Sequence, residues 1–178
     1  MKCDDLDHLV RASLQRLVDD LNHAPWVGRE RELVSLFVFE HLLDEGSRLN
    51  PPLRPGQVGI EVAVPQHPPH GGRRRQPNVC KDVVIWPETR MTTWGPDQQE
   101  LRYPLAVLEW KSFNNVGTLE RHNSKRAEIE RDREWLRVAT GRSSMRGYLI
   151  STNLAEMRRS IACLLVAGGV AQEHWIIE

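Results

Sequence analysis

The sequence predicts an α/β fold of the α+β type, in which helices flank one mixed β-sheet. Helical and strand-like apolar patterns alternate along the chain in the order α-α-β-β-β-α-β-α-β. The chain has 178 residues, of which 40% are hydrophobic and 27% are charged. This length and composition are typical of a single globular domain with its own hydrophobic core.

Two helices are expected before the first strand. Leucine and valine recur at helical spacing from Asp4 to His23, and Pro25 ends the pattern. A second helix is predicted from about Gly28 to Leu43, where apolar residues form a broad stripe. This second helix is therefore expected to be largely buried.

Three strands follow in succession. Residues 59–66 alternate apolar and polar side chains, and residues 80–86 and 105–113 are rich in apolar and β-branched side chains. Two long polar insertions, residues 67–78 and 87–104, separate them. A charged helix at 118–139 and a strand at 147–151 complete the expected core of residues 28–151.

A C-terminal extension from about residue 152 to residue 178 is expected to be a helix followed by a short strand. Asn153 and Glu156 have the spacing of a capping box, and the apolar residues up to Ala167 suggest a long helix. Gly168 and Gly169 would then stop that helix, and residues 174–177 form the strand.

Composition excludes several classes of protein. Lysine and arginine number 24 and so do aspartate and glutamate, so a protein that holds nucleic acid by bulk charge alone is not indicated. No apolar run reaches the length of a membrane span, and the N-terminus lacks the pattern of a signal peptide. Three cysteines without a CxxC spacing predict neither a disulfide framework nor a cysteine zinc site. We expect a cytoplasmic protein that does not bind membranes.

Charged residues near the ends of two predicted strands form the most informative pattern. Glu109 and Lys111 are two apart on a strand, so they project to the same face while Trp110 faces the other way. Asp82 lies near the start of the preceding strand. Two carboxylates on neighbouring strands provide the hard oxygen ligands that Mg²⁺ prefers. A lysine beside them can orient a water molecule or offset charge on a phosphoryl group.

By itself, a Glu-x-Lys pair at the end of a strand is more often an exposed ion pair. Here the flanking residues 83–85 and 105–108 are strongly apolar, so the charges end strands that look buried. Buried charges persist when they are paired or bound to a metal. The apolar context therefore favours a functional site.

The segments 81–85 (Lys-Asp-Val-Val-Ile) and 107–111 (Val-Leu-Glu-Trp-Lys) resemble the two halves of the signature of the PD-(D/E)xK, restriction-endonuclease-like superfamily. The α-β-β-β-α-β core of that superfamily matches the order predicted for residues 28–151. The resemblance implies a metal-dependent endonuclease, a hydrolase in which Asp82 and Glu109 bind Mg²⁺, or Mn²⁺ in its place. It also implies that the Trp110 carbonyl completes the coordination and that Lys111 handles the attacking water.

An acidic residue on the second helix is implied by a further resemblance. Residues 28–34 (Gly-Arg-Glu-Arg-Glu-Leu-Val) are similar to the opening helix of archaeal Holliday-junction resolvases, in which the first glutamate joins the metal site. By position this residue is Glu30. Glu40 lies on the same helical stripe and is its rival, and Glu30 is otherwise an ordinary acid in the first turn of a helix.

Basic residues outside the signature are candidates for contacts with nucleic acid. Arginine is well suited to phosphate, and a loop contains three in succession, although solvated loop charge explains them equally well. These are Arg73, Arg74 and Arg75. The helix after the Glu-x-Lys strand often contributes a polar residue in this superfamily, and its candidates are His122, Asn123 and Lys125.

The expected function is therefore hydrolysis of phosphodiester bonds in nucleic acid, foremost DNA. Duplex-cutting members of the superfamily commonly act as dimers, so a homodimer is also implied. The rival interpretation is a non-catalytic module with a nuclease-like fold that binds nucleic acid or protein. A third is a small accessory domain that dimerises and assists a larger nucleic-acid machine.

Overall fold

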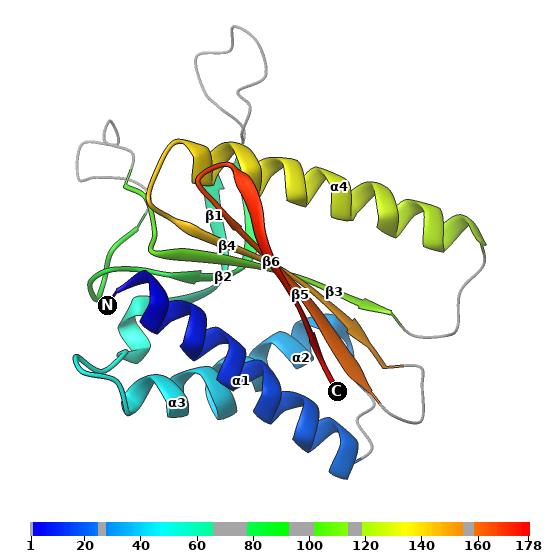
Figure 1. Cartoon of the computed structure of the whole chain (residues 1–178), viewed down its shortest axis with the longest axis horizontal. Helices are drawn as coiled ribbons and strands as arrows, with labels where there is room; N and C mark the ends of the chain where they lie inside the picture. Colours follow the sequence, from blue (N-terminus) through cyan, green and yellow to red (C-terminus); the bar gives the residue numbers. More distant parts are fainter. Residues whose placement is uncertain (1, 25–27, 66–77, 93–101, 114–118, 155–158) are drawn as a thin grey trace, which may run out of the picture.

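The computed structural model describes residues 2–24, 28–65, 78–92, 102–113, 119–154 and 159–178, with only the backbone at Pro65, Asn78 and 119–124. Its centre is a six-stranded mixed sheet in which the strands lie in sequence order (Figure 1). The strands are β1 (Val58–Pro65), β2 (Asn78–Ile85), β3 (Ala106–Phe113), β4 (Arg146–Asn153), β5 (Ser160–Ala167) and β6 (Val170–Ile177). The predicted mixed sheet flanked by helices is confirmed.

All neighbouring strands are antiparallel except β3 and β4, which are parallel. A parallel pair needs a crossover connection, and α4 (Leu119–Gly141) lies between these two strands in the chain. The expected succession of three strands, a crossover helix and a fourth strand is thus present.

Helices cover both faces of the sheet (Figure 1). One face carries α1 (Cys3–His23), α2 (Glu30–Leu36), the π-helical segment η1 (Phe37–Leu42) and α3 (Leu43–Ser47), and α4 covers the other. A short 3₁₀ turn, η2 (Pro55–Gln57), leads into β1. Of the two hydrophobic clusters, the larger lies between the sheet and α1 to η1, and the smaller lies under α4. Among the described residues, no helix could span a membrane.

The second predicted helix exists, but it is not a uniform α-helix. It continues through the π-helical segment to Ser47, and that segment changes which side chains face the sheet. Phe37 and Val38 are buried as expected, whereas Phe39 is 63% exposed and Glu40 is also exposed. Glu40 therefore points away from the sheet.

The prediction of a helix at residues 153–167 is wrong, and the predicted helix-strand extension is therefore wrong as well. β4 runs to Asn153, and residues 160–167 form β5, which pairs with β4 and β6. The C-terminal extension is therefore a β-hairpin, and the predicted final strand at 174–177 is the end of the longer β6.

Two glycines explain this hairpin. Gly168 and Gly169 have φ of 59° and 81° and join the paired residues Ala167 and Val170. Consecutive positive φ values form a two-residue turn whose twist suits antiparallel strands. A short apolar run such as 161–167 is ambiguous between helix and strand, and its pairing partners decide the outcome.

The faces of β1 and β2 reverse at one position, and this reversal places the candidate site. Ile60 packs in the larger cluster and Val62 in the smaller, although strict alternation would put both on one face. Val83 and Val79 on β2 differ in the same way. Between them lies Glu61, with φ of 53°, and Asp82 lies at the matching point of β2.

The turn glycines should differ in their tolerance of substitution. A Cβ at Gly169 would lie 3.2 Å from Gly141 Cα and 3.4 Å from Arg137 O, whereas a Cβ at Gly168 meets nothing within 4 Å. We expect Gly169→Ala to lower the free energy of unfolding by about 1–3 kcal/mol, since it adds a close contact to an unfavourable φ. Gly168→Asn should be nearly neutral, because asparagine tolerates positive φ. Urea unfolding of both variants tests this, and equal losses would contradict it.

Candidate active site

One edge of β3 loses its partner strand halfway along. β2 pairs with β3 only at Ala106, Val107 and Leu108, whereas pairing with β4 on the other edge continues to Phe113. The main-chain groups of Trp110 and Ser112 that face the β2 side therefore need other partners, because unpaired buried amides and carbonyls are costly. We call this stretch the open edge of β3.

Four charged side chains satisfy the open edge. Asp82 Oδ2 accepts a hydrogen bond from the Trp110 amide at 2.6 Å, and Glu30 Oε2 accepts one from the Ser112 amide at 2.5 Å. Lys111 Nζ donates to the Trp110 carbonyl at 2.8 Å, and Lys125 Nζ donates to the Ser112 carbonyl. Carboxylates thus replace strand acceptors and ammonium groups replace strand donors.

One oxygen of the Asp82 carboxylate is fixed by a backbone hydrogen bond and the other is available. Burial raises the pKa of its carboxyl group, while the Trp110 amide and the charge of Lys111 act in the opposite direction. Its Oδ2 is occupied by the Trp110 amide, and no described side chain donates to Oδ1. The second oxygen can therefore coordinate a cation.

Glu109 lies on the α4 side of the sheet in a nearly closed environment. It is 3% exposed, and its Oε1 lies 2.6 Å from Nζ of Lys81, itself 2% exposed. Apart from this ion pair, Oε1 has no hydrogen-bond donor among the described residues. Burial raises the pKa of Glu109 to about 8, although Lys81 opposes the rise.

Asp132 on α4 joins two lysines. Its carboxylate lies 3.3 Å from Lys81 Nζ and 3.2 Å from Lys111 Nζ. Lys81 also lies 4.3 Å from the ring centre of Trp135, one turn further along α4. Burial lowers the pKa of Lys111, but Asp132, Glu109 and Asp82 outweigh it and the net shift is upward. Lys111 is therefore a cation at neutral pH.

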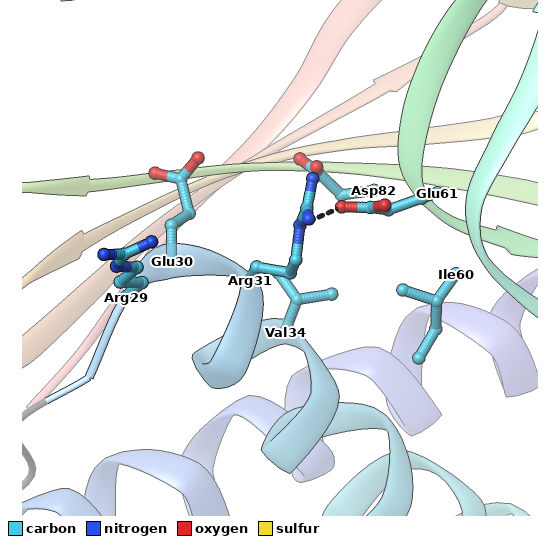
Figure 2. Close-up of a pocket in the computed structure, with 7 residues that line it drawn as sticks. All are labelled: Arg29, Glu30, Arg31, Val34, Ile60, Glu61 and Asp82. Carbon is cyan, nitrogen blue, oxygen red and sulfur yellow. Dashed lines mark ion pairs between the residues drawn. The ribbon is translucent and has the colours of Figure 1, made fainter.

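A hollow of about 310 Å³ opens beside Asp82 between α2 and the β1–β2 pair. Figure 2 shows the residues that line it, which are Arg29, Glu30, Arg31, Val34, Ile60, Glu61 and Asp82. Glu109 is not among them. The two carboxylates of the signature thus approach the open edge from different sides, Asp82 from the hollow and Glu109 from under α4.

The sequence-predicted residues fare differently. Glu109 and Lys111 share one face as expected, and Trp110 is buried on the other, where its indole donates to Thr152. Glu30 reaches the open edge, so its rival Glu40 is excluded from this site. Lys125 contacts the open edge through Ser112.

Other predicted contacts cannot be placed. Arg73, Arg74 and Arg75 lie outside the described residues, as do the side chains of His122 and Asn123.

Sequence reasoning missed Lys81, Ser112 and Asp132. Lys81 faces α4 because β2 reverses its faces at Asp82, and no local sequence pattern predicts that reversal. Asp132 lies in a helix whose many charges look like a solvated face. Among the described residues, no three histidine, cysteine or acidic side chains are already arranged to hold a metal ion. The donors that fit Mg²⁺ are oxygens of Asp82, Glu30, Glu109 and the Trp110 carbonyl, two of which now face lysines.

The chain matches no protein-family model, no curated protein and no solved structure in comparisons of sequence and fold. Functional inference therefore depends on the geometry of the site.

The buried carboxyl of Glu109 predicts how stability depends on pH in metal-free protein. The folded protein keeps a proton on Glu109 up to about pH 8, whereas the unfolded chain releases it near the ordinary glutamate pKa of 4.5. Because the folded state binds more protons between these values, stability falls as pH rises through this window. Glu109→Gln lacks the titrating group, so it should match the wild type near pH 5 and exceed it by on the order of a few kcal/mol at pH 8.

Denaturant unfolding in EDTA at several pH values measures this difference. Glu40→Gln, which removes an exposed carboxylate, is the matched control and should leave the pH profile unchanged. Parallel profiles for the wild type and Glu109→Gln from pH 5 to pH 9 would show that Glu109 is not protonated by burial.

Proposed function

We propose that the protein is a metal-dependent nuclease that hydrolyses phosphodiester bonds, with DNA as the first substrate to test. The observation that carries the proposal is the open edge of β3, where Asp82, Glu30 and Lys111 converge on Trp110 and Ser112 beside a hollow. Asp82 and Lys111 belong to the PD-(D/E)xK signature that the sequence resembles, and Glu30 belongs to the helix that is similar to the opening helix of Holliday-junction resolvases.

Mg²⁺ is the cation that suits this donor set, and Mn²⁺ can substitute for it. Asp82 and Glu30 each use one carboxylate oxygen on a backbone amide and have a second oxygen for coordination. Glu109 and the Trp110 carbonyl now contact Lys81 and Lys111, so binding would exchange an ammonium for the metal. A bound Mg²⁺ supplies Lewis acidity toward the phosphate and the attacking water.

Lys111 acts as a cation in this proposal. Its raised pKa argues against a neutral amine that removes a proton, and it favours a role in orienting water and offsetting charge on the phosphoryl group. Asp132 restrains Lys111 from the α4 side, and the Trp110 carbonyl restrains it at the open edge. The positive charge of Lys111 thereby favours the ionised form of the Asp82 carboxylate.

A second candidate function is favoured by the ion pairs under α4. Contacts among Lys81, Glu109, Asp132 and Lys111 connect the sheet to α4. Such a network can have the purely structural role of holding the helix against the sheet. In that case the protein would be a non-catalytic module that binds nucleic acid or protein.

Cleavage assays separate the two candidates. We expect the wild type to cleave DNA with Mg²⁺ or Mn²⁺ and to lose activity in EDTA, on linear duplex, nicked, branched or single-stranded substrates. Asp82→Asn and Lys111→Ala should each lower the rate by about 100-fold or more, as removal of a group at the reacting centre does. Gel analysis of end-labelled substrates over time provides the measurement. Activity that survives both substitutions would exclude this site.

The acidic residue on α2 can be tested in parallel. Glu30→Gln should weaken Mn²⁺ binding, measured by calorimetry, and slow cleavage, because it removes a candidate ligand at the open edge. Glu40→Gln is the matched control on the same helical stretch, and its exposed side chain should leave both quantities unchanged. Mn²⁺ binding that is equal in the two variants would contradict a role for Glu30 in the metal site.

A further inference from the structure

We propose that Arg31 binds a backbone phosphate of the nucleic-acid strand in the hollow beside Asp82, and that Glu61 holds this arginine until the phosphate replaces it. The inference rests on the proposed function, and it assigns the substrate-binding part of that site. The ligand class is a polynucleotide strand, recognised through its phosphates.

The ion pair between Arg31 and Glu61 forms part of the wall of the hollow. Figure 2 shows the Arg31 side chain rising from α2 toward the sheet, with its guanidinium paired with Glu61. The side chain of Arg31 is 76% exposed and that of Glu61 is 41% exposed. Solvent-exposed ion pairs are weak, so an incoming anion can displace the glutamate at little cost.

Glu61 occupies the point at which β1 reverses its faces. Its φ of 53° is unfavourable for a residue with a side chain and is found here within a strand. Backbone conformations of this kind are often retained at binding sites, where they aim a side chain. Here the carboxylate is aimed at Arg31, across the hollow from the candidate ligand Glu30.

The dimensions and lining of the hollow suit a segment of polynucleotide. Its volume of about 310 Å³ is at the lower end of ligand sites, and it is open to solvent. Val34 and Ile60 provide apolar surface, while Arg29 and Arg31 provide guanidinium groups that can form paired hydrogen bonds with phosphate oxygens. Asp82 also lines the hollow, which would bring a phosphate held by Arg31 close to the candidate metal ligands.

The charge of the lining makes binding depend on the metal. Two arginines face three carboxylates, Glu30, Glu61 and Asp82, so the hollow has one negative charge in excess and repels a polyanion. A divalent cation reverses that sign. Release of Arg31 from Glu61 would then present the guanidinium to the strand. Metal binding therefore precedes tight binding of nucleic acid.

Binding can be measured without cleavage. Fluorescence anisotropy of a 5′-labelled 20-nucleotide DNA, single-stranded and duplex, is recorded in Ca²⁺ and in EDTA, with gels to verify that the DNA stays intact. We expect wild-type affinity to be at least tenfold higher in Ca²⁺. Arg31→Ala and Arg31→Gln should each lower the affinity in Ca²⁺ by about tenfold, as loss of a charge-assisted phosphate contact does.

Glu61→Gln provides the opposite test. It frees Arg31 and removes one negative charge, so we expect binding several-fold tighter than wild type, with the larger gain in EDTA. The exposed pair Arg137–Glu134 on α4 gives matched controls. Arg137→Ala and Glu134→Gln change net charge equally but should shift affinity less than twofold. Thermal unfolding of every variant verifies the fold.

The outcomes distinguish this inference from the proposed function. Affinities of the Arg31 variants equal to that of Arg137→Ala, or weaker binding by Glu61→Gln, would overturn the role of Arg31 even if the protein cleaves DNA. The expected pattern of affinities without cleavage would support the Arg31 site and contradict the nuclease. Absence of DNA binding by the wild type in Ca²⁺ would overturn the inference as well.

Discussion

The separation of β2 from β3 after Leu108 is the constraint on which the candidate site depends. It exposes main-chain donors and acceptors of Trp110 and Ser112 on one edge, inside a protein where unpaired groups are costly. Asp82 and Glu30 accept from the amides, and Lys111 and Lys125 donate to the carbonyls. Charged side chains from β2, α2, β3 and α4 are thus brought together by the needs of the backbone. A structural requirement and a potential catalytic constellation coincide in the same atoms.

The same separation divides the charges between two environments. Asp82 faces the hollow under α2, whereas Glu109 is enclosed with Lys81 beneath α4. Without Lys81, Glu109 would lose its buried partner, and its ionised form would lose its counter-ion. Lys81 therefore keeps Glu109 close to the open edge in the absence of metal. Asp132 contacts both Lys81 and Lys111, so one carboxylate stays beside the two lysines when Glu109 is protonated.

Local patterns predicted much of this molecule. Periodicity predicted α1, the helical stretch that contains α2, and β1, while runs of apolar and β-branched residues predicted β2 and β3. The face shared by Glu109 and Lys111 followed from the pleat of a strand. Residues 160–167 were assigned to a helix because their pairing with β4 and β6 is non-local, although the Gly168–Gly169 turn was a usable sign of a hairpin. Lys81 and Asp132 escaped notice since their partners are far away in sequence.

The reversal of β1 and β2 at Glu61 and Asp82 shows why residue identity at the site has to be considered together with the backbone. With regular alternation, Asp82 would share a face with Val84 and Trp86, which pack against α4. The reversal instead places Lys81 under α4 and Asp82 beside α2. Lys81 and Asp82, although adjacent in sequence, therefore lie on opposite faces of the sheet. The positive φ of Glu61 lies at the matching reversal of β1, the strand paired with β2. The backbone of Glu61 is therefore as much part of the site as its carboxylate.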